Sequence, residues 1–84
     1  MNKKLNTNIG AIDCDLPTGA PDPVEWLEDI DGVIDLTAAD VDRRDLFGGS
    51  EEEWRVEIRA GSGWYLIIRN DASGELSASV EYED

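Results

Sequence analysis

The last third of the chain alternates apolar and polar residues, and this pattern constrains the fold more than any other feature. Glu53–Ala60 alternates strictly, Trp64–Arg69 is mostly apolar, and Leu76–Tyr82 alternates again. Successive side chains of a β-strand point to opposite faces, so the pattern predicts three strands that each bury one face. Gly61–Gly63 would form a hairpin loop, and Asn70–Glu75 would form the next turn. We therefore expect a C-terminal three-stranded antiparallel meander.

The length of the first loop predicts the register of the meander. A three-residue loop pairs Ile58 with Leu66, and we expect Ile68 to pair with Leu76. A slip by one residue would turn the apolar side chains toward solvent. On this register the core face of the sheet consists of Trp54, Val56, Ile58, Trp64, Leu66, Ile68, Leu76, Ala78 and Val80.

A helix is predicted in the first half of the chain. Asp22 is a good N-cap, and it precedes a proline and Glu25 in the first helical turn. We expect the helix to end near Ile30 and to pack Trp26, Leu27 and Ile30 over the sheet.

The other N-terminal segments give weaker patterns. Residues 9–16 and 33–36 predict short strands, and residues 37–50 form either a helical turn capped by Thr37 or an acidic loop. Residues 1–8 are polar, and we expect them to be frayed. A chain of 84 residues forms one domain. We expect this domain to cover residues 1–84 and to have a fold of the α+β class. One or two short acidic helices would pack on a small antiparallel sheet that includes the C-terminal three-stranded meander.

The negative charge is concentrated in the middle of the chain. The formal net charge is −13, and residues 13–53 hold fourteen acidic residues against two arginines. Residues 22–42 hold eight acidic residues and no basic one. Such a one-signed field repels nucleic acid and membranes, and it attracts basic surfaces, which proteins that bind nucleic acid commonly have.

The expected contact residues follow from this charge pattern. The carboxylates expected to face a partner are Asp13, Asp15, Asp22, Glu25, Glu28, Asp29, Asp31, Asp35, Asp40 and Asp42. Apolar contacts are expected from Trp26, Ile30, Tyr65 and Ile67, because the last two lie on the sheet face opposite the core.

The sequence offers little for catalysis. It has no histidine, and its single cysteine, Cys14, lies between Asp13 and Asp15, which disfavour the thiolate. The acidic stretch around Asp31 does not match a calcium loop. We therefore expect no enzyme activity, no cofactor and no metal site. The single cysteine and the absence of a long apolar segment favour the cytoplasm.

Three segments resemble the phage-encoded inhibitors of uracil-DNA glycosylase. Trp64–Ile68 with the turn that follows is similar to the C-terminal hairpin of that family, Pro23–Ile30 to its acidic second helix, and Asp35–Ala38 to the strand after it. The resemblance implies an acidic edge strand that mimics the DNA backbone and an apolar pocket between helix and sheet. It would make Asp13 and Asp15 the edge-strand carboxylates.

The same resemblance implies roles for other residues. Glu25 and Glu28 would be the helix carboxylates, and the residues lining the pocket would be Trp26, Ile30, Ile58 and Ile67. The sequence of the family's edge strand is absent here.

Three functional readings follow. The first is an acidic DNA-mimic inhibitor, encoded by a phage and directed against a host repair glycosylase, restriction enzyme or CRISPR component. The second is an immunity protein or antitoxin that blocks a basic nuclease toxin. The third is an accessory domain whose carboxylates only interact with solvent. For the first two readings the partner is the basic surface of another protein, with no direct binding to nucleic acid or membrane, and the chain is a monomer or homodimer.

Overall fold

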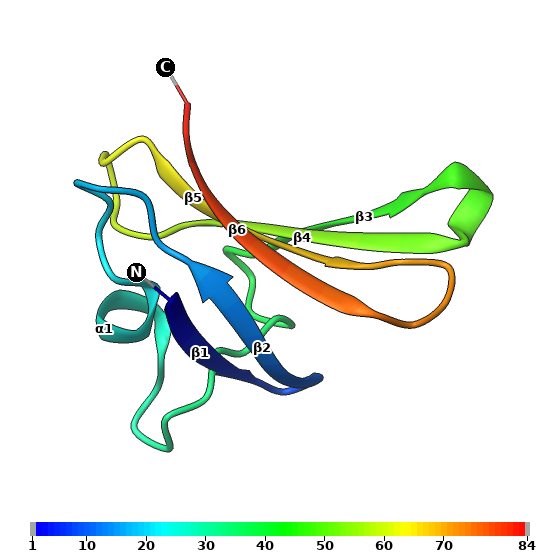
Figure 1. Ribbon diagram of the computed structural model, residues 1–84, viewed down its shortest axis with the longest axis horizontal. Coiled ribbons are helices and arrows are strands. Elements are labelled where there is room, and N and C mark those ends of the chain that lie inside the picture. Colours follow the sequence, from blue (N-terminus) through cyan, green and yellow to red (C-terminus); the bar gives the residue numbers. More distant parts are fainter. Residues whose placement is uncertain (1, 84) are drawn as a thin grey trace.

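A six-stranded sheet dominates the computed structural model, which describes residues 2–83 (Figure 1). The strand order is β1-β2-β6-β5-β4-β3, and all neighbours are antiparallel except β2 and β6, which are parallel. The fold is therefore a small mixed sheet with little helix. The strands are β1 (Asn2–Thr7), β2 (Gly10–Asp15), β3 (Asp42–Leu46), β4 (Glu51–Glu57), β5 (Trp64–Asn70) and β6 (Leu76–Tyr82).

The C-terminal meander has four strands, because β3 adds to the three that the alternation predicts. The predicted register is wrong by two residues in both hairpins. Val56 pairs with Leu66, and Ile68 pairs with Ala78. The first loop is longer than expected, since the Ile58 backbone N–H donates to Trp64 and leaves residues 59–63 in the loop.

The predicted core face is nevertheless confirmed. A shift of two residues preserves the alternation, so each side chain stays on the face to which the pattern assigned it. Six of the predicted residues are buried, and Trp64, Leu76 and Ala78 pack against them partly buried. The buried six are Trp54, Val56, Ile58, Leu66, Ile68 and Val80.

The N-terminal segment is part of the sheet. The expectation that residues 1–8 are frayed is wrong for Asn2–Thr7, which form β1 and pair with β2; Met1 lies outside the described residues. The strand forms because Leu5 and Thr7 alternate with polar residues and are buried. β2 therefore has a neighbour on each side and is not an edge strand.

Residues 16–41 connect β2 to β3, and we call them the covering layer. The layer contributes Ile34 and Leu36 to the core, and the backbone of Ile34 also forms hydrogen bonds with Asn6 of β1 and with Asn8, just after that strand. In Figure 1, α1 (Pro23–Leu27) lies beside β1, and the hairpin of β3 and β4 extends away from it. The predicted strand over residues 33–36 is reduced to a single bridge between Ile34 and Thr7.

The helix is shorter than predicted. Asp22 caps it as expected, with its side chain accepting the backbone N–H of Val24, but α1 ends at Leu27. The reason lies in Asp29, whose carboxylate accepts the N–H groups of Asp31 and Val33 and so forms a turn in place of a further helical turn.

Residues 37–50 were expected to form a helical turn or an acidic loop. They contain β3 instead, after turns over residues 36–40 and before the 3₁₀ turn η1 (Phe47–Gly49). β3 is charged throughout most of its length, with the sequence DRRDL, which explains why no apolar alternation announces it.

Candidate functional site

The ten carboxylates expected to form one surface lie on two sides of the sheet. Seven belong to the covering layer, namely Asp22, Glu25, Glu28, Asp29, Asp31, Asp35 and Asp40. The other three, Asp13, Asp15 and Asp42, point to the opposite side of the sheet, because their strand neighbours Ile12 and Cys14 are buried and Asp42 pairs with Arg55. We call that side the outer face.

Three carboxylates of the covering layer accept backbone N–H groups, namely the N-cap Asp22, Asp29 and Asp35. Asp35 accepts hydrogen bonds from the N–H and the hydroxyl of Thr37 at 2.9 and 2.6 Å, and Asp29 forms the turn described above. The side-chain hydrogen bond from Thr37, with that from its backbone, lowers the pKa of Asp35. These carboxylates are needed for the fold itself.

The N-cap Asp22 has an additional ionic partner. Its carboxylate lies 2.9 Å from the Nζ of Lys3 on β1. Partial burial acts to raise the pKa of Asp22, but hydrogen bonds from Lys3 and from Val24 outweigh burial and lower it. This contact ties α1 to the first strand.

The remaining four carboxylates of the covering layer have no such role. Within residues 2–83, no hydrogen bond or ion pair engages the side chains of Glu25, Glu28, Asp31 and Asp40. The layer contains no basic residue that could neutralise them. They are the carboxylates that remain available to a partner.

On the outer face, by contrast, several carboxylates lie beside basic side chains. Arg69 donates to Glu53 at 3.0 Å, Arg55 contacts Glu83, and the carboxylate of Asp42 lies 3.7 Å from Arg44. Arg55 and Arg69 therefore each have a carboxylate partner. Asp13 is 3.8 Å from Lys4. Asp13 and Asp15 both lie on β2, which has a neighbouring strand on each side. The acidic edge strand that the resemblance implies is therefore not found at these residues.

The apolar contact residues also divide. Trp26 is 47% exposed and Ile30 is fully exposed, so neither packs over the sheet as the helix pattern predicted. Both are surrounded in sequence by acidic residues of the covering layer. Ile67 is only 6% exposed, and Tyr65 is half-buried with Arg55 stacked on its ring at 5.0 Å. Tyr65 and Ile67 therefore do not form the apolar patch that was expected on the outer face. Of the four expected apolar contact residues, Trp26 and Ile30 are the exposed ones.

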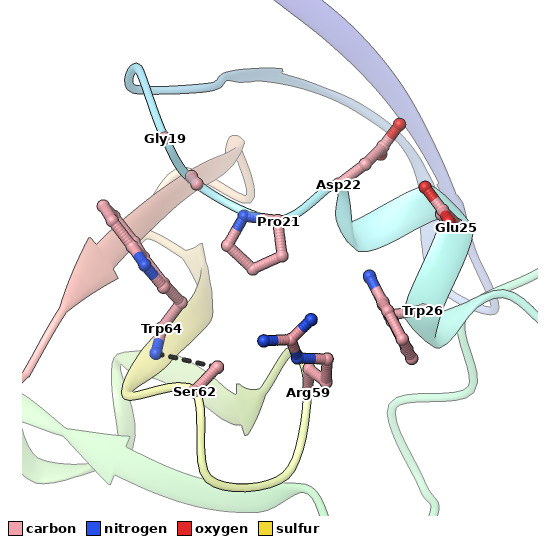
Figure 2. Close-up of a pocket in the computed structure, with 9 residues that line it drawn as sticks. Gly19, Pro21, Asp22, Glu25, Trp26, Arg59, Ser62 and Trp64 are labelled. Carbon is pink, nitrogen blue, oxygen red and sulfur yellow. Dashed lines mark hydrogen bonds between the residues drawn. The ribbon is translucent and has the colours of Figure 1, made fainter.

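Two cavities flank α1, and both have Trp26 and Arg59 in their walls. The first, of about 490 Å³, lies between Trp26 and Trp64, with Pro21 and Arg59 between them in Figure 2. The second, of about 540 Å³, lies between the helix and β4 and is lined by Trp26, Leu27, Asp40, Val56, Glu57, Ile58, Arg59 and Ala60. Of the four residues that the resemblance assigns to an apolar pocket, Trp26 and Ile58 meet in the second cavity, whereas Ile30 and Ile67 do not.

Sequence reasoning missed Arg59, Ser62 and Trp64 as site residues. Arg59 lies in the loop before β5, and its guanidinium carbon is 5.4 Å from the centroid of the Trp26 ring. Among residues 2–83 it has no carboxylate partner. The glycines on both sides of Ser62 were the available signal, since they permit the longer loop that carries Arg59 away from the strand.

One further apolar side chain is exposed far from α1. Phe47 is 76% exposed at the tip of the β3–β4 hairpin and has a φ of 51°, which is unusual for a bulky residue. Gly48 and Gly49 continue the turn with positive φ.

Cys14 is buried in the core. Burial, and to a smaller degree the charge of Asp15, raises the pKa of its thiol to about 11 from 9.0. The thiolate is therefore a minor species at neutral pH.

Two further searches concern residues 2–83. They contain no group of three or more metal-ligating side chains placed to hold an ion. None of their helices is long and apolar enough to cross a membrane. Comparisons of the chain with protein-family models, with curated proteins and with solved structures find no match.

Proposed function

We propose that this protein is an acidic inhibitor that occupies the nucleic-acid-binding surface of another protein. The observation that supports this most is the covering layer, in which seven carboxylates occur without one basic residue, around the exposed side chains of Trp26 and Ile30. Charges that serve only solubility do not require exposed aromatic and aliphatic side chains among them.

The chemistry of such a surface fits a basic partner. Unpaired carboxylates at Glu25, Glu28, Asp31 and Asp40 would take the positions of phosphates on arginine and lysine side chains. The one-signed field would speed encounter with a basic surface, and this effect weakens as salt increases. Exposed apolar residues such as Trp26 supply binding energy that charge alone does not, because desolvated aromatic anchors dominate most interfaces.

The cavity between α1 and β4 supports the same proposal. Leu27, Val56 and Ile58 give it an apolar wall beside Trp26, and its volume of about 540 Å³ accommodates a large side chain of a partner. An apolar pocket of this kind is what the resemblance to inhibitors of uracil-DNA glycosylase implies. We therefore include repair glycosylases among the proposed targets, with restriction and CRISPR components.

The structure determines which variant tests the proposal. Neutralising Asp22 or Asp29 would disturb α1 and the turn after it, so the test variant changes Glu25, Glu28, Asp31 and Asp40 to their amides. A control variant changes four carboxylates outside the covering layer to their amides, namely Asp13, Glu51, Glu75 and Glu81. Each variant removes four charges from the formal −13, so their net charges match.

The experiment is affinity capture from bacterial lysate with elution in a salt gradient, followed by identification of the retained proteins. We expect the wild-type and control proteins to retain a nucleic-acid-binding protein that free DNA displaces, and we expect the test variant to lose it. Equal retention by the two variants would show that net charge, and not the covering layer, is responsible. A retained nuclease toxin would favour the immunity or antitoxin reading, and no retained basic protein near 0.1 M salt would favour the accessory domain.

A further inference from the structure

The cavity between Trp26 and Trp64 contains an aromatic ring that already holds a guanidinium group. Arg59 stacks on the indole of Trp26 with its guanidinium carbon 5.4 Å from the ring centroid. Trp26, Glu25 and Arg59 all line this cavity of about 490 Å³, and Figure 2 shows Glu25 and Trp26 on the helix and Arg59 on the loop beside it. A cation over the face of an indole is attracted by the ring quadrupole.

We propose that this cavity binds an arginine side chain of the partner protein, which displaces Arg59 from the Trp26 ring and pairs with Glu25. This inference rests on the proposed function in one respect, namely that the partner presents basic side chains. It adds a specific subsite, a ligand group and an internal competitor.

Arg59 is held weakly enough to be displaced. All six other basic side chains in residues 2–83 lie within 3.8 Å of a carboxylate oxygen. Arg59 has only the ring contact among the described residues. It is also exposed, so water can replace the contacts that it loses.

An incoming arginine would gain a contact that Arg59 does not make. Glu25 lines the same cavity as Trp26, yet its carboxylate accepts no hydrogen bond from the described residues. Asp22, the other carboxylate of this cavity, is already bound by Lys3. A guanidinium that stacks on Trp26 and donates to Glu25 would combine cation–π attraction with a charge-assisted hydrogen bond. Its planar fork suits both contacts better than an ammonium does.

The test uses small probes and the purified protein. The probe is acetyl-arginine amide, and its uncharged isostere acetyl-citrulline amide is the control. Binding is followed by the indole N–H resonances in ¹H–¹⁵N NMR spectra. The three tryptophans give an internal control, because Trp54 is buried in the core while Trp26 and Trp64 line the cavity.

We expect saturable shifts of the Trp26 and Trp64 resonances with the arginine probe, with Trp54 unchanged. Arg59→Gln removes the internal competitor and should tighten binding about threefold, whereas Glu25→Gln and Trp26→Leu should each weaken it about fivefold, as expected for the loss of roughly one such contact. Glu25 and Arg59 are exposed, so both variants should fold.

Equal shifts with the citrulline probe, no saturable shift, or weaker binding by Arg59→Gln would each overturn the arginine subsite. None of these results involves the partner protein, so they leave the proposed function standing. Conversely, an arginine subsite in a protein that retains no basic partner would remove the proposed function alone.

Discussion

The outer face of the sheet and the covering layer carry the same type of charge but use it differently. On the outer face, carboxylates lie beside arginines, as Glu53 does with Arg69 and Glu83 with Arg55. In the covering layer, carboxylates either accept backbone N–H groups, as Asp29 does, or have no partner among the described residues, as for Asp31. Ion pairs reduce the charge of the first surface, whereas in the covering layer Asp22 alone has an ionic partner, Lys3, among residues 2–83.

This difference shows that the number of carboxylates alone does not define a binding surface. A surface ion pair contributes little free energy, but it cancels the field that would attract a distant partner. A carboxylate that caps a turn is constrained by the fold. Only the unpaired carboxylates combine a full charge with freedom to contact another molecule.

The largest expected effect separates the inner side of the covering layer from its outer side. Ile34 is 2% exposed. Ile34→Ala should reduce the free energy of unfolding by about 3 kcal/mol, because the removed side-chain carbons leave a cavity in the core. Ile30 is fully exposed, so Ile30→Ala should change it by less than about 0.5 kcal/mol. Urea unfolding followed by tryptophan fluorescence measures both. Similar losses in the two variants would mean that the layer is not anchored through Ile34.

The next effect compares a paired carboxylate with an unpaired one. Glu53 is buried and accepts the Arg69 hydrogen bond, so Glu53→Gln should cost about 1.5 kcal/mol of unfolding free energy. Glu25→Gln should be neutral or slightly stabilising, because it removes repulsion and no contact. Urea titrations at low salt give both values, and a larger loss for Glu25→Gln would refute the division of the two surfaces.

A smaller effect concerns the turn that ends α1. Asp29→Ala removes an acceptor for two backbone N–H groups and should lower stability by about 1 kcal/mol. Asp29→Asn keeps an acceptor oxygen and should recover most of that loss. Thermal unfolding of the three proteins decides the matter: if the asparagine variant is as unstable as the alanine variant, the charge and not the hydrogen bonding of Asp29 supports the turn.

The smallest expected effect is the dependence of folding stability on acidic pH. Hydrogen bonds lower the pKa of Asp35, and they also lower the pKa of Asp22 although partial burial opposes this. The folded chain therefore binds fewer protons than the unfolded chain near and below the ordinary pKa of 3.8. Their contribution to stability is complete above that value and is lost as pH falls through the lowered pKa values.

Urea titrations between pH 5 and pH 2.5 should therefore show stability declining toward acid. The decline should be shallower in Asp35→Asn, which cannot titrate at this position. Parallel curves for the two proteins would contradict the lowered pKa of Asp35.

The sequence predicted the faces of the strands better than their partners. Val56 and Leu66 were assigned to the core correctly, although the loop length placed each opposite the wrong residue. The alternation of side chains is a local property of each strand, so a register shift of two residues leaves every side chain on the same face. β1 and β3 were missed because Leu5 is the only large apolar residue of the first and the second is mostly charged.

The candidate site was predicted only in part. The acidic composition of the covering layer and the presence of Trp26 in it are visible in the sequence. Which carboxylates pair is not, because Lys3 and Asp22 meet across nineteen residues and Arg69 meets Glu53 across sixteen. The contact of Arg59 with Trp26 likewise joins a loop after β4 to a helix far earlier in the chain.

By itself, the sequence determined which residues can be buried, where the one-signed charge lies, and that the chain has no histidine for acid–base chemistry. These are properties of side chains and of their local order. Only the tertiary structure decided that Asp13 and Asp15 lie on the other side of the sheet from Glu25, and that Ile67 is buried while Ile30 is exposed. The physical reason is that charge pairing and exposure depend on strand order and on chain segments that meet across long separations, which local pattern does not encode.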